Sequence, residues 1–199
     1  MNDEYITLLR ETRSEMKVRG SRFVAVARPV SAKPEFESML AELKKEYFDA
    51  THHCYAYRMG INGGQFRQND DGEPGGSAGK PILGTIDKFS LTDVGIIVIR
   101  YFGGTKLGVG GLVRAYSGAA EAALTAGSLV TKYAVGMLEA TFPHAHVSNV
   151  MHVVNAVGAR IVDTTYDDEV HLRLSIRQSR LEELRSSLVN RTSGNIAIR

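Results

Sequence analysis

Residues Ile96–Tyr116 read IIVIRYFGGTKLGVGGLVRAY, and this stretch decides the fold of the first part of the chain. The apolar, β-branched run Ile96–Ile99 predicts a strand buried on both faces of a sheet. Leu112 and Tyr116 begin an apolar stripe at helical spacing, which predicts a helix that opens at Gly110-Gly111. Five glycines mark the connection and the helix start: Gly103, Gly104, Gly108, Gly110 and Gly111. Such a run indicates positive φ angles or a backbone that another group approaches closely.

The start of this helix predicts an anion site. Backbone N–H groups in a first helical turn have no partner within the helix and favour a negative charge. Three basic residues surround the turn: Arg100, Lys106 and Arg114. The dinucleotide fingerprint G-x-G-x-x-G is absent, because Val113 stands at its third glycine. We therefore expect an unconventional contact between Gly108–Gly111 and a phosphate or an RNA backbone. The alternative is a tight loop that lets the helix pack closely on the sheet.

A second glycine-rich loop, Asn69–Pro81, reads NDDGEPGGSAGKP. Its glycines, prolines and carboxylates are typical of a shaped loop. It is not a Walker A motif, because Pro81 follows Gly79-Lys80 where Ser or Thr is required. The candidate ligand residues of the loop are Asp70, Asp71, Glu73 and Lys80. The three carboxylates would suit a hard cation, but loop hydrogen bonds and helix capping are the simpler interpretation.

The predicted strand Ala50–Met59 carries histidines next to the one cysteine of the chain. Alternation places His52 and Cys54 on one face and His53 on the other. His52 and Cys54 would suit a transition metal or a nucleophile with its base, but a metal site needs further ligands. A packed cysteine is the simpler interpretation, so we predict no metal, no cofactor and no catalytic residue. An enzyme that acts on a small phosphorylated or acyl substrate, at this strand and the Asp70–Lys80 loop, is the alternative function.

The chain as a whole predicts two domains, residues 1–132 and residues 133–199. A hairpin at Gly20-Ser21 and a helix after Ser31 precede the histidine strand. Beyond Lys132 the pattern predicts the order β-α-β-β-α-β, which is the ferredoxin-like arrangement. Ser179 and Glu182 predict a capping box for its last helix.

The predicted strand Val170–Arg177 places Arg173 and Arg177 on the sheet face away from the helices. A basic sheet face is a familiar surface for RNA. Of the stacking aromatic residues only Tyr166 is a candidate, and residues 134–199 carry seven basic and seven acidic side chains. A solvated polar face is therefore the alternative.

Composition narrows the setting. The 199 residues carry a formal net charge of +2, which is well short of the bias of a dedicated nucleic-acid-binding domain. A single cysteine favours a reducing cytoplasm. The polar first residues predict no signal peptide, and no apolar segment is long enough to span a membrane.

Two long motifs carry a family resemblance. Asp71–Pro81 resembles the signature D-G-E-P-x-G-[ST]-A-G-x-P of the IMPACT family, in its bacterial YigZ-like branch. Arg100–Tyr116 is similar to the second family signature, R-Y-[FY]-G-G-x-x-L-G-x-G-G-L-V-x-A-Y. The last domain is similar, in topology and length, to the small C-terminal domain of that branch, which is likened to a domain of elongation factor G.

The resemblance implies an α/β (α+β) protein with a ribosomal-protein-S5-domain-2-like first domain. It also implies a connection with nucleic acid or the ribosome and brings no catalytic residues. We therefore expect a cytoplasmic, RNA- or ribosome-associated protein that modulates translation and binds rather than catalyses. The glycine loop with Arg100, Lys106 and Arg114 would contact phosphates, and Arg173 and Arg177 would add a second contact. A regulator that binds a protein partner is the second alternative.

Overall fold

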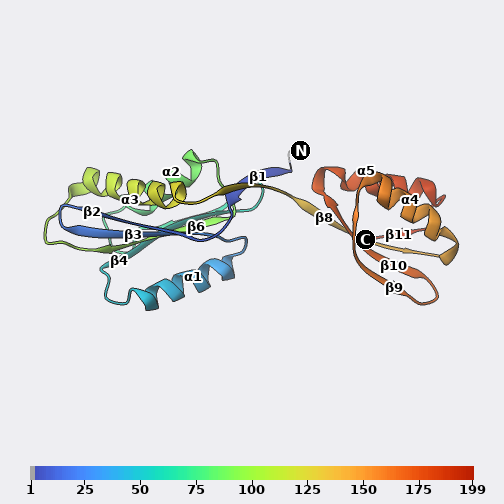
Figure 1. The fold of residues 1–199 in the computed structure, drawn as a ribbon, viewed down its shortest axis with the longest axis horizontal. Coiled ribbons are helices and arrows are strands. Elements are labelled where there is room, and N and C mark those ends of the chain that lie inside the picture. Colours follow the sequence, from blue (N-terminus) through green and yellow to red (C-terminus); the bar gives the residue numbers. More distant parts are fainter. Residues whose placement is uncertain (1–2) are drawn as a thin grey trace. The chain divides into compact units, whose positions relative to one another are not determined.

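The computed structural model describes residues 3–199, which form two compact units (Figure 1). One unit comprises Tyr5–Lys132, and the other comprises Tyr133–Arg199 together with the first described residues, Asp3 and Glu4. No helix within residues 3–199 is long and apolar enough to cross a membrane.

The first unit is built on a five-stranded antiparallel sheet between two layers of helix. Its strands lie in the order β2 (Thr12–Val18), β3 (Ser21–Pro29), β6 (Val94–Tyr101), β4 (His52–Met59) and β5 (Gln65–Asn69). Helices α2 (Gly79–Lys88) and α3 (Gly108–Thr125) cover one face, and α1 (Lys33–Glu46) covers the other (Figure 1). The predicted central strand is confirmed, because β6 is buried from Val94 to Arg100.

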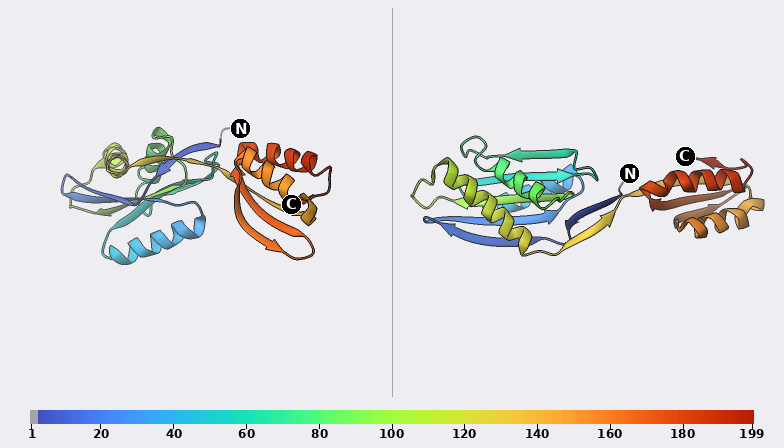
Figure 2. Two further views of the ribbon diagram at one scale, coloured as in Figure 1. Left: turned by 45° about the vertical axis from the view of Figure 1, so that its right-hand side comes forward. Right: turned by 90° about the horizontal axis from the view of Figure 1, so that it is seen from above.

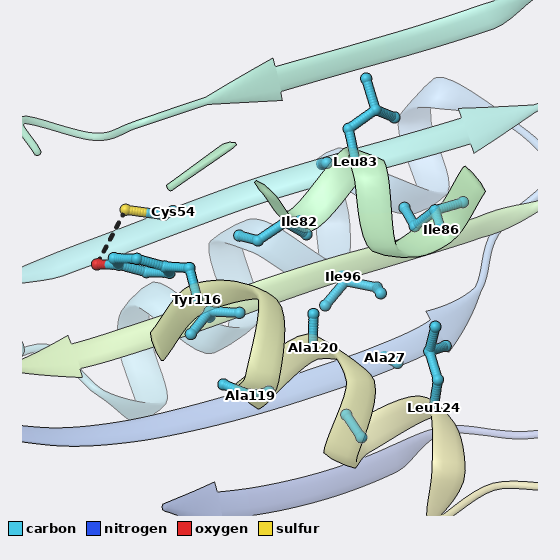
Figure 3. Packing of buried hydrophobic residues seen from close by; sticks show 14 of the residues in the cluster. Ala27, Cys54, Ile82, Leu83, Ile86, Ile96, Tyr116, Ala119, Ala120 and Leu124 are labelled. Carbon is cyan, nitrogen blue, oxygen red and sulfur yellow. Dashed lines mark hydrogen bonds between the residues drawn. The ribbon is translucent and has the colours of Figure 1, made fainter. Parts of the chain in front are cut away.

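Each face of the sheet has its own apolar core. Toward α2 and α3, Cys54 and Ile96 pack with Ile82, Tyr116 and Leu124, as Figure 3 shows. Toward α1, the alternate strand residues meet the helical stripe predicted from the sequence: Val26, Ile97, Ile99, Phe36, Met39 and Leu43. The two cores confirm the prediction that successive residues of β4 point to opposite faces of the sheet, with His52 and Cys54 on one face and His53 on the other.

Three strands and two helix starts differ from the prediction. The additional strands are β1 (Glu4–Leu8) and β7 (Leu129–Tyr133), which pair with each other, and β5 at the sheet edge. Side chains of β5 and β7 are largely exposed, so neither strand shows an alternating apolar pattern. Helix α2 begins at Gly79 because proline is tolerated in a first turn, and α3 begins at Gly108.

The second unit has the predicted ferredoxin-like fold. Its elements are β8 (Val135–Phe142), α4 (Val147–Val157), β9 (Arg160–Tyr166), β10 (Val170–Arg177), α5 (Leu181–Arg191) and β11 (Ala197–Ile198). The sheet order is β11-β8-β10-β9, and both helices cover one face of it (Figure 2). Short 3-10 turns, η1 (His144–His146) and η2 (Gln178–Arg180), precede the helices.

The predicted capping box at α5 is wrong. The N-cap residue is Arg180, and Ser179 lies in the preceding 3-10 turn. Ser179 instead binds Asp3: its backbone N–H donates to both carboxylate oxygens, at 2.8 and 2.9 Å, and its hydroxyl donates to the same carboxylate. A partner from the other end of the chain replaces the local cap, which a sequence motif does not reveal.

Candidate functional site

Loops from three parts of the chain meet at one end of the first unit's sheet. In the strand register, Arg22 lies opposite Tyr101 and His52 lies opposite Arg100. The tip of the β2–β3 hairpin, the loop after β6 and the entry to β4 are therefore neighbours. A Cβ added at Gly103 would lie 2.0 Å from the backbone of Gly20, so the close approach predicted for the glycine run is confirmed there.

The loop between β6 and α3, residues 102–107, leads into an open helix N-terminus. Gly104 and Gly108 have φ angles of +82° and +71°, which glycine adopts without steric cost. The N-cap residue of α3 makes no side-chain hydrogen bond, and the first turn contains no acidic residue. Lys106 and Arg114 are exposed, and no ion pair joins either to another residue in the described part of the chain.

Gly110 has no steric reason to be glycine. Its φ is not positive, and the nearest atom to an added Cβ would be a guanidinium nitrogen of Arg114, at 3.7 Å. Helix interiors disfavour glycine, so its presence in the first turn favours a group that must reach the backbone closely.

A pocket of about 330 Å³ lies beside this helix start. Its walls are mainly apolar: Pro74, Phe102, Leu107, Val109 and Leu112, with Lys106 and Gly108 at the loop. Glu73 and Arg100 are buried polar residues that also line it. The pocket thus joins an apolar space to the open end of α3.

Arg100, which the sequence groups with the predicted phosphate contacts, is already paired within the protein. It is 4% exposed, and its Nη1 donates to Oε1 of Glu73 at 2.6 Å. Its Nη2 donates to the hydroxyl of Ser21 at 3.2 Å, and its guanidinium lies over the rings of Phe23 and Phe102. A phosphate at the loop would therefore meet Lys106 and Arg114 rather than the charge of Arg100.

This buried ion pair is part of a larger polar cluster. The hydroxyl of Tyr116 donates to the same Glu73 oxygen at 2.7 Å, and His52 Nε2 lies 3.9 Å from it. Arg100 Nε is buried and has no hydrogen-bond partner. Buried polar groups without partners are rare in folded proteins, so this atom marks a position where a ligand or water would improve the bonding.

The second glycine-rich loop has its helix N-terminus already occupied by a carboxylate. Asp70 accepts backbone N–H groups of Gly76, Ala78 and Gly79 at 2.8–2.9 Å. Burial raises the pKa of Asp70, but these three hydrogen bonds outweigh it, so the pKa lies below its ordinary value. The simpler interpretation of this loop, hydrogen bonding and helix capping, is confirmed.

The other carboxylates of this loop are also engaged by the protein. Asp71 accepts the backbone N–H of His53 at 2.6 Å, and its carbonyl accepts His52 Nδ1 at 2.8 Å. Lys80 is exposed on the first turn of α2. Within residues 3–199, no group of three His, Cys, Asp or Glu side chains is placed to hold a metal ion.

Cys54 is part of the core. Its thiol is fully buried, donates to the carbonyl of Asp70 at 2.9 Å and lies 3.3 Å from the Tyr116 hydroxyl, drawn as a dashed line in Figure 3. Burial raises the pKa of Cys54 to about 12. A nucleophile needs an accessible thiolate, so the alternative that pairs His52 with Cys54 for catalysis lacks its reactive group.

The open sheet face of the second unit carries charges of both signs. Arg173 lies between Glu139 and Asp163 in the strand register, and its Nε binds Glu139 at 3.2 Å. Arg177 stacks on the ring of Tyr133, at 3.6 Å from its centroid. The two arginines lie on the predicted face, but the face is not uniformly basic.

Family models cover most of both units. The Impact N-terminal domain matches residues 19–124, which include both glycine-rich loops, and a domain of unknown function, DUF1949, matches residues 141–195. The chain belongs to the IMPACT family. The IMPACT family member YvyE of Bacillus subtilis is 28% identical over 199 residues, covering 100% of this chain and 92% of that protein. An IMPACT family member of Haemophilus influenzae is 30% identical, covering 92% and 90% respectively.

A solved structure supports the fold of this IMPACT family chain. The crystal structure of a hypothetical protein superposes with a TM-score of 0.76 at 24% identity, and covers 100% of this chain and 97% of that one. The mixed α/β fold and the membership of the YigZ-like branch predicted from the two motifs are thus confirmed.

Sequence reasoning missed three residues of the site. Ser21 is fully buried and binds both Arg100 and the backbone N–H of Gly103. Tyr116 was placed in the apolar stripe of a helix, but its hydroxyl binds Glu73. Phe102 is 46% exposed and forms a wall of the pocket. A signal existed for two of them, because Phe102 and Tyr116 stand inside the second family signature.

Proposed function

We propose that this IMPACT family member is a cytoplasmic protein that binds RNA, in particular ribosomal RNA, and thereby modulates translation. Membership of the family supports a general regulatory role associated with translation. The observation that carries the proposal is the uncapped N-terminus of α3, an 18-residue helix, with Lys106 and Arg114 exposed beside it. Free N–H groups, the helix dipole and two unpaired cations all favour phosphate.

An exposed aromatic side chain in the loop before this helix suits single-stranded RNA. Phe102 is 46% exposed and lines the pocket beside α3. Exposed aromatic rings stack on unpaired bases without selecting a sequence, while cations follow the backbone. In the second unit, Arg177 offers an additional contact, whereas Arg173 is already paired with Glu139.

Binding of a single-stranded oligoribonucleotide and cosedimentation with ribosomes, each across a salt series, test the proposal. The variant Lys106→Ala/Arg114→Ala removes two phosphate contacts, so it should bind RNA at least tenfold more weakly. It should also reduce the slope of log affinity against log salt by about 1.4. Ribosome association should fall in parallel.

The matched control is Arg10→Ala/Lys132→Ala. Both residues are exposed and lie outside the glycine loop. Their replacement therefore removes the same charge from another part of the surface. If the two double variants weaken binding equally, only net charge matters and the loop is not the site. If ribosome association survives nuclease digestion of RNA, the surface binds a protein partner and the RNA proposal is wrong.

A further inference from the structure

The pocket beside α3 has the shape and chemistry of a site for one nucleotide unit. We propose that a nucleobase enters this pocket while the phosphate attached to its ribose lies at the N-terminus of α3. This inference rests on the proposed phosphate contact of the glycine loop and adds a base-binding site to it.

The size and lining of the pocket fit an aromatic heterocycle. Its volume of about 330 Å³ lies at the small end of the range of ligand pockets. Phe102 stands at its edge with an exposed ring, and Pro74, Val109 and Leu112 supply further apolar surface. An exposed aromatic ring provides a stacking surface that an unpaired base of any sequence can occupy.

Polar groups lining the pocket fit a base better than a purely apolar molecule. Glu73 uses Oε1 for both Arg100 and Tyr116. Its Oε2 accepts no hydrogen bond from any of residues 3–199. A carboxylate oxygen accepts N–H groups, and adenine, guanine and cytosine each carry an amino group on the edge that would enter.

Arg100 provides the second, independent indication of a ligand. Arg100 is 4% exposed and lines the pocket, and its Nε has no hydrogen-bond partner among residues 3–199. Nε is covered by neighbouring atoms in the free protein, and ring nitrogens and carbonyl oxygens of bases are acceptors, so a base that displaces the pocket wall at Arg100 would supply this partner.

The residues that line the pocket also indicate where the phosphate would lie. Lys106 and Gly108 line the pocket on the side of the glycine loop, where the helix begins. Gly110, in the same turn, has no side chain, so the backbone of the first turn stays accessible there. A nucleotide with its base inward would thus place its phosphate against the open end of α3, next to Lys106.

The test fills the pocket without changing charge. Val109 is 58% exposed, so Val109→Phe should fold normally, and unchanged thermal unfolding would establish this. We expect its affinity for a single-stranded oligoribonucleotide to fall at least tenfold, with an unchanged salt slope. The control is Val189→Phe, which alters a helical valine that is 38% exposed on α5 and should bind as the wild type does. A second variant, Phe102→Ala, removes the stacking wall and should weaken binding similarly.

Free 5′-mononucleotides distinguish the source of the nucleotide unit. If adenosine or guanosine monophosphate binds at least tenfold more tightly than inorganic phosphate and Val109→Phe removes this gain, the pocket holds a base. If mononucleotides bind and RNA does not, the pocket stands but the proposed function fails. If RNA binds through Lys106 and Arg114 while Val109→Phe and Phe102→Ala bind as tightly as the wild type, this inference alone is wrong.

Discussion

The two glycine-rich loops of the first unit look alike in sequence and differ in what they present. Residues 69–81 run into the first turn of α2, and residues 102–111 run into the first turn of α3. At α2, the carboxylate of Asp70 accepts three backbone N–H groups. At α3, no acidic side chain occupies the first turn, and two exposed cations flank it.

This difference separates a structural loop, residues 69–81, from a proposed binding loop, the one before α3. A helix N-terminus attracts negative charge, and the protein itself supplies that charge at α2. No acidic side chain does so in the first turn of α3, where we propose that a phosphate binds. Glycine content alone therefore does not indicate a ligand site, because a nearby aspartate can satisfy the same groups.

The largest expected effect is at Glu73, which lies in the structural loop and lines the pocket of the binding loop. Glu73→Gln would leave the buried guanidinium of Arg100 without its counter-charge. Losing one partner of a buried pair costs about 3–5 kcal/mol, so the free energy of unfolding in urea should fall by that amount. Glu183→Gln, which breaks an exposed pair with Arg180, should cost less than about 1 kcal/mol. Equal effects would mean that the pair does not hold the two loops together.

The next effect concerns the cap of α2. Asp70→Ala removes the acceptor of three N–H groups and should lower the free energy of unfolding by about 2 kcal/mol at pH 7. Because folding lowers the pKa of Asp70, its contribution is present above the ordinary aspartate pKa of about 4 and is lost as the pH falls through the folded value. The difference between wild type and variant should therefore narrow in acid. A constant difference between pH 7 and pH 2.5 would contradict an ionised cap.

The smallest expected change in stability is at Gly110. Gly110→Ala adds a methyl group where nothing lies closer than 3.7 Å, so the free energy of unfolding should be unchanged or rise by up to about 1 kcal/mol. RNA affinity should nevertheless fall, because the methyl group obstructs approach to the first turn. A destabilised variant would show that Gly110 is needed for the fold, and a variant that binds RNA as tightly as the wild type would give Gly110 no role in binding.

Sequence patterns predicted the parts of the fold in which burial is continuous or follows a period. The continuously buried β6, the stripe of α1 and the alternation of β10 are of this kind. Strands β5 and β7 lack the pattern because their side chains are exposed on edges. Tertiary partners also escaped prediction, since Asp3 binds Ser179 across 176 positions of the chain.

The sequence predicted which residues lie at the candidate site better than it predicted what those residues do there. Lys106 and Arg114 lie exposed at the glycine loop, as the sequence suggested. Arg100 was predicted to contact phosphate beside them, but strand alternation turns it toward the same face as Cys54, where it pairs with Glu73. Charges of both signs lie side by side on the sheet of the second unit, because Glu139 of β8 lies opposite Arg173 of β10. The sequence of one strand alone does not reveal this pairing.

The most direct measurement is a titration of ¹⁵N-labelled full-length protein with inorganic phosphate and then with a single-stranded oligoribonucleotide, followed by backbone amide shifts. The account predicts saturable shifts at Gly108–Gly111 and Lys106, while the amides of Gly76, Ala78 and Gly79, already bound to Asp70, stay unchanged. Shifts of equal size at both helix starts, or shifts confined to residues 76–79, would contradict the division between a structural and a binding loop.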